Sequence, residues 1–181
     1  SDHDHPYAED AKVLNATTES NKPAHVVSFN NQVAVFNDDS GIVHVYKTDE
    51  HAIDAAPAFQ YEYKGTPHHG VAIPLQNNEL AVSFVAKEGD ALPAGVKIVN
   101  DKGEEQHVIT EACTDLHGAA YVDNTLAFGC IGSVVLYDVA TKETNEIALK
   151  DEAGRVSTLK FTDDSDYLLA NYSVNKAPAT E

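Results

Sequence analysis

Short apolar segments alternate with polar turns along most of the chain, from Pro23 to about Tyr172. The apolar segments are rich in Val, Ile, Tyr and Phe, and Asn, Asp or Gly bounds each of them. Such segments and turn residues are typical of β-strands joined by tight turns. The periodicity of an amphipathic helix is almost absent, so the pattern predicts an all-β fold.

The apolar segments recur in units of four, and a histidine stands near the start of each unit. His69 and His117 are 48 residues apart (117 − 69) in the matching stretches Thr66–Ala72 and Thr114–Ala120. A fainter, earlier copy begins at His25. The second segments of the three units are Asn31–Val35, Asn78–Val82 and Asn124–Phe128. Four strands per unit at this period are typical of a β-propeller blade.

We therefore predict an all-β propeller with about three and a half four-stranded blades in residues 22–181. The blades are expected at residues 23–65, 66–112 and 113–152, and a fourth begins with Ser157–Phe161. Because a propeller closes with about 4–8 blades, this number would leave open strand edges. We expect the chain to be part of a larger propeller, with a second polypeptide or another copy completing the ring.

The charge of the chain limits its partners. Its formal net charge is −17, which repels phosphate backbones and argues against nucleic-acid binding. No apolar run approaches the roughly 18 residues of a membrane span, so no membrane insertion is expected. The sequence has no Met and begins at Ser1, which fits a secreted or periplasmic protein after removal of its leader. An artificial chain boundary fits as well.

The histidines in register point to a metal site. The first strand of each blade lines the central channel, so His25, His69 and His117 would surround one mouth of it. His68 is adjacent to this ring, and Asp115 is the nearest carboxylate in the same loop as His117. Two or three imidazoles with a carboxylate or water are a known ligand set for zinc. The alternative is that each histidine ties a loop to a backbone carbonyl.

A second candidate metal site lies in residues 1–21, a segment that we expect to be flexible. His3, Asp4 and His5 alternate imidazole and carboxylate groups, which suits weak capture of a cation. The alternative is a tag remnant or a leader without function.

The two cysteines, Cys113 and Cys130, flank His117 and allow three interpretations. A disulfide between them would hold the corner in place and imply an oxidising compartment. Either sulfur could instead be a zinc ligand, or both could be buried thiols.

Three motifs, together with the N-terminal His/Asp tract, resemble the AztD-type periplasmic zinc chaperones. The motifs are His68–Gly70, Asp115–Gly118 and Phe128–Cys130. The resemblance covers most of this chain but only about half of a full-length member. It implies a β-propeller, encoded with a zinc ABC importer, that hands zinc to the solute-binding protein of that importer. It further implies zinc at His68, His69 and His117, with His3 and His5 assisting capture or transfer.

Three functions remain open from the sequence. The first is a zinc carrier that is not an enzyme, the second a metal-dependent secreted propeller hydrolase, and the third a propeller scaffold for protein interactions. No nucleophile elbow, Ser-His-Asp arrangement or phosphate-binding loop is readable, which favours the carrier over the hydrolase.

Overall fold

The computed structural model describes residues 18–48, 58–161 and 167–174. Three antiparallel sheets of four strands each follow one another along the chain, and within every sheet the strands are in sequence order. The first sheet contains β1 (Pro23–Phe29), β2 (Gln32–Asn37), β3 (Ile42–Lys47) and β4 (Ala58–Lys64). The second contains β5 (Ala72–Pro74), β6 (Leu80–Phe84), β7 (Gly95–Val99) and β8 (Glu105–Thr110), with a 3₁₀ turn at Gln76–Asn78. The third contains β9 (Gly118–Val122), β10 (Thr125–Gly129), β11 (Ser133–Asp138) and β12 (Thr144–Ala148).

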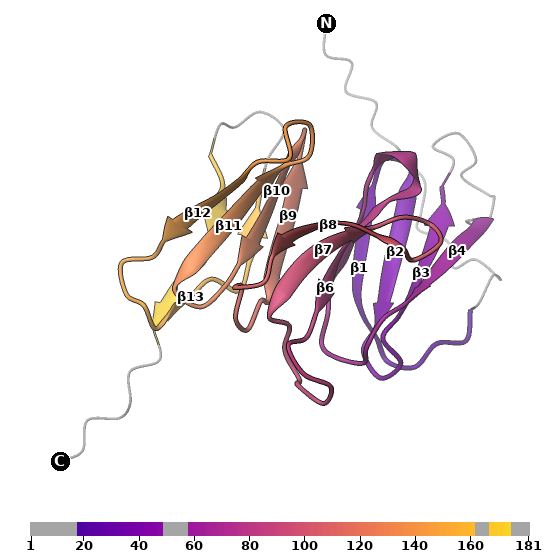
Figure 1. The fold of residues 1–181 in the computed structure, drawn as a ribbon, viewed down its shortest axis with the longest axis horizontal. Coiled ribbons are helices and arrows are strands. Elements are labelled where there is room, and N and C mark those ends of the chain that lie inside the picture. The colour runs from indigo at the N-terminus through magenta and orange to yellow at the C-terminus, as the bar shows by residue number, and fades with distance from the viewer. Residues whose placement is uncertain (1–17, 49–57, 162–166, 175–181) are drawn as a thin grey trace, which may run out of the picture.

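The sheets lie side by side like consecutive propeller blades, from the first sheet at the right of Figure 1 to the third at its left. The predicted all-β partial propeller of four-stranded blades is thus confirmed. Among the described residues, no helix is long and apolar enough to cross a membrane.

The described residues from Gly154 to Val174, which we call the fourth unit, form two small sheets. Strand β13 (Gly154–Arg155) pairs with β16 (Ser173–Val174), and β14 (Leu159–Lys160) pairs with β15 (Leu169–Ala170). The sequence predicted a longer first strand, Ser157–Phe161. The observed strand starts later because the N–H groups of Ser157 and Thr158 donate to the side chain of Asn171.

Tight turns hold the strands in register. Asn30 and Asn31 connect β1 to β2 with φ angles of 50° and 56°. A two-residue hairpin turn with both residues at positive φ matches the twist of the flanking strands, and Asn tolerates that conformation. The turn therefore fixes which side chains of β1 and β2 face the neighbouring sheet, because a shift of one residue would exchange the two faces.

Side chains from neighbouring sheets form the hydrophobic cores between them. Because successive residues of a strand point to opposite faces, one strand contributes to two cores. On β6, Leu80 and Val82 pack toward the first sheet, whereas Ala81 packs toward the third. A third core joins Ala127 and Val134 of the third sheet to Val156 and Leu159 of the fourth unit.

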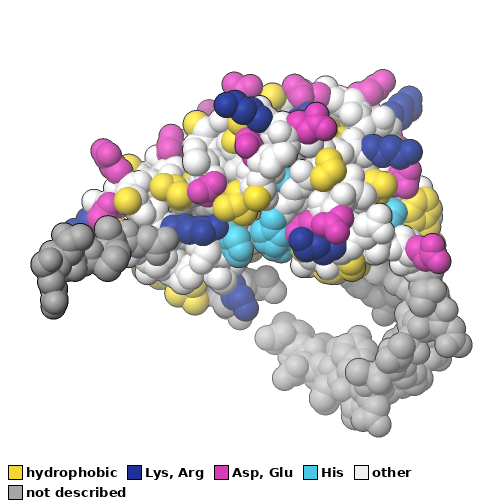
Figure 2. Space-filling model, turned by 90° about the horizontal axis from the view of Figure 1, so that it is seen from below, with side chains coloured by type: hydrophobic (Ala, Val, Ile, Leu, Met, Phe, Trp, Pro, Cys, Tyr) yellow, Lys and Arg dark blue, Asp and Glu magenta, His cyan; other side chains and the backbone are white. Residues whose placement is uncertain are grey.

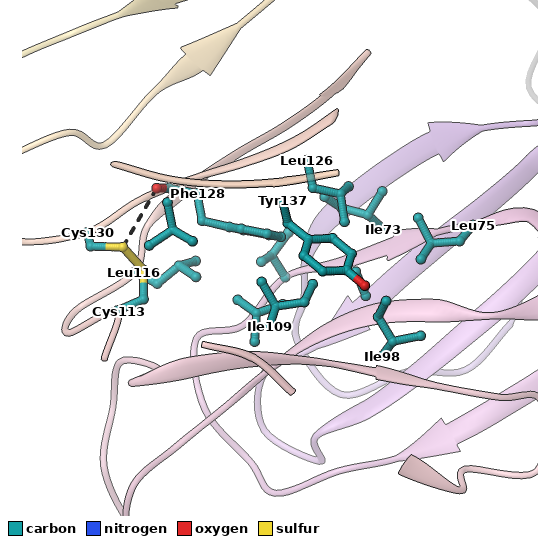
Figure 3. Close-up of a cluster of buried hydrophobic side chains, with 14 residues drawn as sticks. Ile73, Leu75, Ile98, Ile109, Cys113, Leu116, Leu126, Phe128, Cys130 and Tyr137 are labelled. Carbon is teal, nitrogen blue, oxygen red and sulfur yellow. Dashed lines mark hydrogen bonds between the residues drawn. A yellow bond between two sulfur atoms is a disulfide. The ribbon is translucent and has the colours of Figure 1, made fainter. Parts of the chain in front are cut away.

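A disulfide lies within the core between the second and third sheets (Figure 3). It joins Cys113 to Cys130, and both residues are fully buried. Leu116, Phe128 and Tyr137 belong to the same buried cluster. The disulfide excludes the two alternatives of a thiolate zinc ligand and a pair of free thiols.

In the described part of the chain, no other sheet packs against the face of the first sheet that points away from the second sheet. Val33 of β2 pairs with Tyr46 of β3, as Leu80 pairs with Val99 in the second sheet. Leu80 and Val99 are fully buried, but Val33 and Tyr46 are only partly buried. Both line a groove of about 410 Å³, and Phe59, 55 % exposed, lies at its side. We call this surface the outer face.

Candidate metal centre

Three histidines from three different sheets lie together. His25 is on β1, His69 precedes β5, and His117 immediately precedes β9. The ring centroids of His25 and His69 are 4.7 Å apart, those of His69 and His117 are 5.4 Å apart, and those of His25 and His117 are 6.3 Å apart. Figure 2 shows histidine side chains gathered near the middle of the face seen from below. The structure therefore brings together the histidines that the repeat placed in register.

A buried carboxylate accompanies these imidazoles. Asp38, in the turn after β2, is 6 % exposed, and its Oδ2 lies 2.7 Å from Nδ1 of His69. His25, Asp38 and His69 can each present a ligand atom, and these atoms lie within 4.8 Å of one another. An imidazole that donates Nδ1–H to a carboxylate keeps its Nε2 lone pair for a metal. We call His25, Asp38, His69 and His117 the histidine cluster.

Two polar atoms of the histidine cluster are buried without a partner. Nδ1 of His25 and Oδ1 of Asp38 have no hydrogen bond within the described part of the chain. Leaving a buried polar atom unpaired costs about 1–3 kcal/mol, and more for a charged group, so such atoms are uncommon. A bound cation would satisfy a carboxylate oxygen and an imidazole lone pair, so the residues present fit a metal ion.

His117 has one ring nitrogen engaged and the other available. Its Nδ1 lies 3.1 Å from the carbonyl oxygen of Ser157 in the fourth unit. A carbonyl only accepts hydrogen bonds, so Nδ1 carries the proton and Nε2 holds the lone pair. In the neutral ring, His117 therefore has Nε2 free to bind a metal.

The environment of His25 lowers the pKa of its imidazole. Burial is the main cause that lowers the pKa of His25 below its ordinary value, and the positive charge of a protonated His69 lowers the pKa further. A neutral imidazole is the form that binds a metal.

The same shift makes the stability of the folded chain depend on pH. Burial lowers the pKa of both His25 and His68 in the folded state. Below about pH 6.5, the unfolded chain then binds protons that the folded chain does not, so these histidines reduce the free energy of unfolding as pH falls. Their stabilisation is complete above pH 6.5.

We expect the urea midpoint of the metal-free chain to decrease less between pH 7.5 and 5.5 in His25→Gln than in the wild type. The comparison cancels the contribution of the many carboxylates, which both proteins share. An identical change in the two proteins would contradict the prediction. The measurement is equilibrium unfolding in the presence of a chelator.

His68 is turned away from the histidine cluster. It is 5 % exposed, its Nδ1 lies 2.7 Å from the carbonyl oxygen of Thr66, and its Nε2 lies 2.9 Å from Oγ of Ser83. Both ring nitrogens are thus engaged inside the second sheet. We correct the predicted ligand set accordingly: His68 ties the loop before β5 to the sheet and is left out of the ligands that we propose.

The structure does not bring Asp115 into the histidine cluster either. Asp115 has a φ of 51° and lines a separate hollow together with Asp90. Asp38 is the carboxylate beside the imidazoles, and the sequence analysis missed it. The second candidate site, His3, Asp4 and His5, lies outside the described residues.

The comparisons with known proteins concern the fold. No family model and no curated protein matches the sequence. Two solved structures of AztD from Citrobacter koseri, one of them apo AztD, superpose with TM-scores of 0.72 and 0.70 at 24 % identity. Each match covers 89 % of this chain and 44 % of the AztD chain, so this chain spans less than half the length of AztD.

More distant structures agree on the architecture. The computationally designed Ika4 protein matches with a TM-score of 0.61 and 13 % identity, over 90 % of this chain and 92 % of its own. The WD40 domain of Neurospora crassa Pan2 matches with a TM-score of 0.51 and 13 % identity, over 84 % of this chain and 44 % of its own. At these identities the likeness concerns the fold alone. The chain has an AztD-type β-propeller fold.

Proposed function

We propose that this chain belongs to a zinc carrier of the periplasm, which binds zinc at the histidine cluster and passes it to the solute-binding protein of a zinc ABC importer. One observation carries the proposal. His25, Asp38 and His69 can present ligand atoms within 4.8 Å of one another, the ring of His117 lies 5.4 Å from that of His69, and two atoms of this set are buried without a partner. In this function zinc is the cargo of the protein.

The donor set suits zinc better than the other common divalent cations. Zinc binds imidazole nitrogen and carboxylate oxygen in a tetrahedral arrangement, whereas calcium and magnesium prefer sets made of oxygen alone. His25, His69 and His117 with Asp38 would supply four such donors. The AztD-type fold and the sequence resemblance support zinc and the importer as the destination. The Cys113–Cys130 disulfide supports an oxidising compartment such as the periplasm.

The exposure of the site supports a carrier rather than a hydrolase. The side chain of His69 is 35 % exposed, so an ion held there can be reached by an acceptor protein. A hydrolase would need a substrate cleft beside an open coordination position. The N-terminal His3 and His5 are proposed to assist loading or unloading, as the resemblance implies.

The test of this function is zinc binding followed by transfer. The purified chain is dialysed, its zinc content measured, and its affinity determined by competition with a chromogenic chelator. The loaded chain is then mixed with a zinc-free solute-binding protein in the presence of chelator. We expect one tightly held zinc per chain, transfer faster than release to the chelator, and slower transfer when residues 1–5 are deleted. Loss of zinc on dialysis would refute zinc binding, and binding without transfer would refute the carrier role.

We also propose that a second polypeptide continuing the repeat covers the outer face. Val33 and Tyr46 of the first sheet are equivalent to Leu80 and Val99 of the second sheet. The first sheet buries Leu80 and Val99, whereas nothing in the described part of the chain buries Val33 and Tyr46 to the same extent. The cores between neighbouring sheets thus indicate that the apolar face of another blade would fit this surface. An uncovered sheet also leaves apolar surface in water and invites association.

An acidic substitution on the outer face is expected to disrupt this association. We expect the chain to co-purify with the second polypeptide and so to run above its own mass of 19.5 kDa in solution, and Val35→Asp to return it to that mass. Val35 lines the groove. The matched control is Ile147→Asp, at a residue that is 52 % exposed on the outer strand β12. Native mass spectrometry measures both. A folded wild-type chain found only at its own mass would show the proposal to be wrong.

A further inference from the structure

We infer that Asn171, an exposed residue of the fourth unit, is a positioning residue for the zinc ligand His117. The inference rests on the proposed function, because it concerns how one ligand of the histidine cluster is oriented. Asn171 lies just after β15 and acts through the segment Val156–Thr158.

Within the described part of the chain, the hydrogen bonds of Asn171 go to two consecutive residues, Ser157 and Thr158. Its Oδ1 accepts from the backbone N–H groups of Ser157 and Thr158 at 3.0 and 2.7 Å. Its Nδ2 donates to Oγ of Ser157 at 2.9 Å. The backbone N–H of Asn171 donates to the carbonyl of Thr158 at 3.2 Å. Four hydrogen bonds thus fix the orientation of both peptide groups.

The segment held in this way carries the hydrogen-bond partner of His117. The carbonyl of Ser157 accepts from Nδ1 of His117 at 3.1 Å. This bond sets the tautomer of the imidazole and leaves Nε2 without the proton. Partners of this kind tune the affinity of a metal ligand without touching the metal.

Glycines let the segment lie directly against the third sheet. A Cβ atom on Gly118, the residue after His117, would lie 3.0 Å from the carbonyl carbon of Ser157. A Cβ on Gly129 would lie 2.3 Å from the carbonyl oxygen of Val156, closer than real Cβ contacts occur. The backbones therefore touch at Gly118, which follows His117, and at its strand partner Gly129, whose carbonyl accepts from the N–H of His117. A displacement of the Val156–Thr158 segment would be transmitted to the ligand with little room for adjustment.

Asn171 is suited to this role because it both accepts and donates. Asp in its place keeps an oxygen for the two N–H groups and loses only the bond to Oγ of Ser157. Ala removes all three side-chain bonds. Loss of an outer partner of a ligating histidine typically weakens metal binding about 10- to 100-fold. We expect about tenfold for Asn171→Ala, because Asn171 acts through Ser157.

The test is a double-mutant cycle on zinc affinity, measured by chelator competition with the full chain. Asn171→Ala is expected to weaken zinc binding about tenfold, and Asn171→Asp to retain most of the affinity. In a His117→Ala background, Asn171→Ala should cause no further loss, because the ligand that it positions is gone. Asn145→Ala, at an exposed Asn on β12, is the matched control and should bind zinc like the wild type.

Unchanged affinity in Asn171→Ala would overturn the inference, as would an equal loss with and without His117. A second readout needs no zinc. Nitrogen NMR shifts of the His117 ring report its tautomer in the metal-free chain, and we expect the Nδ1–H form to lose population in Asn171→Ala. A tautomer that shifts in a protein without zinc affinity would refute the proposed function while supporting the positioning by Asn171. A tautomer that does not shift would overturn the positioning itself.

Discussion

His69→Ala is expected to lower the zinc affinity of this chain by two orders of magnitude or more while leaving the sheets folded. Zinc sites with four protein ligands bind with about 10–16 kcal/mol, so one ligand accounts for a few kcal/mol, roughly a hundredfold to a thousandfold. His69 is the central member of the histidine cluster, because it contacts the rings of both His25 and His117 and the carboxylate of Asp38. Its side chain is partly exposed, so its removal leaves no large internal cavity.

The same measurement separates the other members of the histidine cluster. We expect losses of similar order for His25→Ala and His117→Ala, and a loss for Asp38→Asn that shows the importance of its charge. His107→Ala is the matched control, because His107 lies on the outer strand β8 and stacks on Tyr137 at 5.5 Å. It should reduce stability slightly and leave zinc affinity unchanged.

Each variant needs a check that its fold is intact, by circular dichroism and thermal unfolding in the presence of a chelator. Two results would contradict the histidine cluster as the zinc site. One is wild-type zinc affinity in both His69→Ala and His117→Ala. The other is a loss in His107→Ala as large as theirs, which would mean that zinc binds imidazoles indiscriminately.

The sequence was sufficient for the architecture and for the convergence of His25, His69 and His117. Both follow from the repeat, because residues at equivalent positions of stacked units lie near one another in space. The fourth unit was predicted less well. Ser157 and Thr158 bond to the side chain of Asn171, whereas the sequence predicted an uninterrupted strand there. The repeat pattern does not predict this contact.

The sequence failed where a ligand does not repeat. Asp38 follows Asn37 in a turn of the first sheet, and no equivalent carboxylate stands at that place in the other two units. Asp115 was chosen for its nearness to His117 along the chain, which says little about nearness in space. His68 was chosen because it adjoins His69, yet its two ring nitrogens bond to the carbonyl of Thr66 and to Oγ of Ser83, and adjacency in sequence does not predict these contacts.

Removing the disulfide is the second change for which we expect a large effect, and this effect is on stability. Cys113 and Cys130 are 17 residues apart in sequence. A cross-link that closes a loop of about this length restricts the unfolded chain and stabilises the fold by about 3 kcal/mol. For a chain of this size, that corresponds to a decrease in the melting temperature of roughly 6–12 °C.

The double substitution Cys113→Ala and Cys130→Ala is expected to show this loss while zinc affinity at low temperature stays within a few-fold of the wild type. The loop that carries His117 has other attachments: the N–H of Cys113 donates to the carbonyl of Ala94, and the N–H of His117 donates to the carbonyl of Gly129. These backbone bonds do not depend on sulfur. The site should therefore remain assembled as long as the chain is folded.

The control separates the cross-link from the packing of the sulfur atoms, since both cysteines are fully buried. Wild-type chain that is unfolded, reduced and refolded with excess reductant keeps both sulfur atoms but lacks the bond between them. If the cross-link supplies the stability, reduced wild type and the double alanine variant should lose a similar free energy of unfolding, measured by urea titration. A loss confined to the alanine variant would assign the effect to packing in the core between the second and third sheets. A melting temperature unchanged in both would show that the disulfide contributes nothing to the fold, and the argument from the unfolded chain would be wrong.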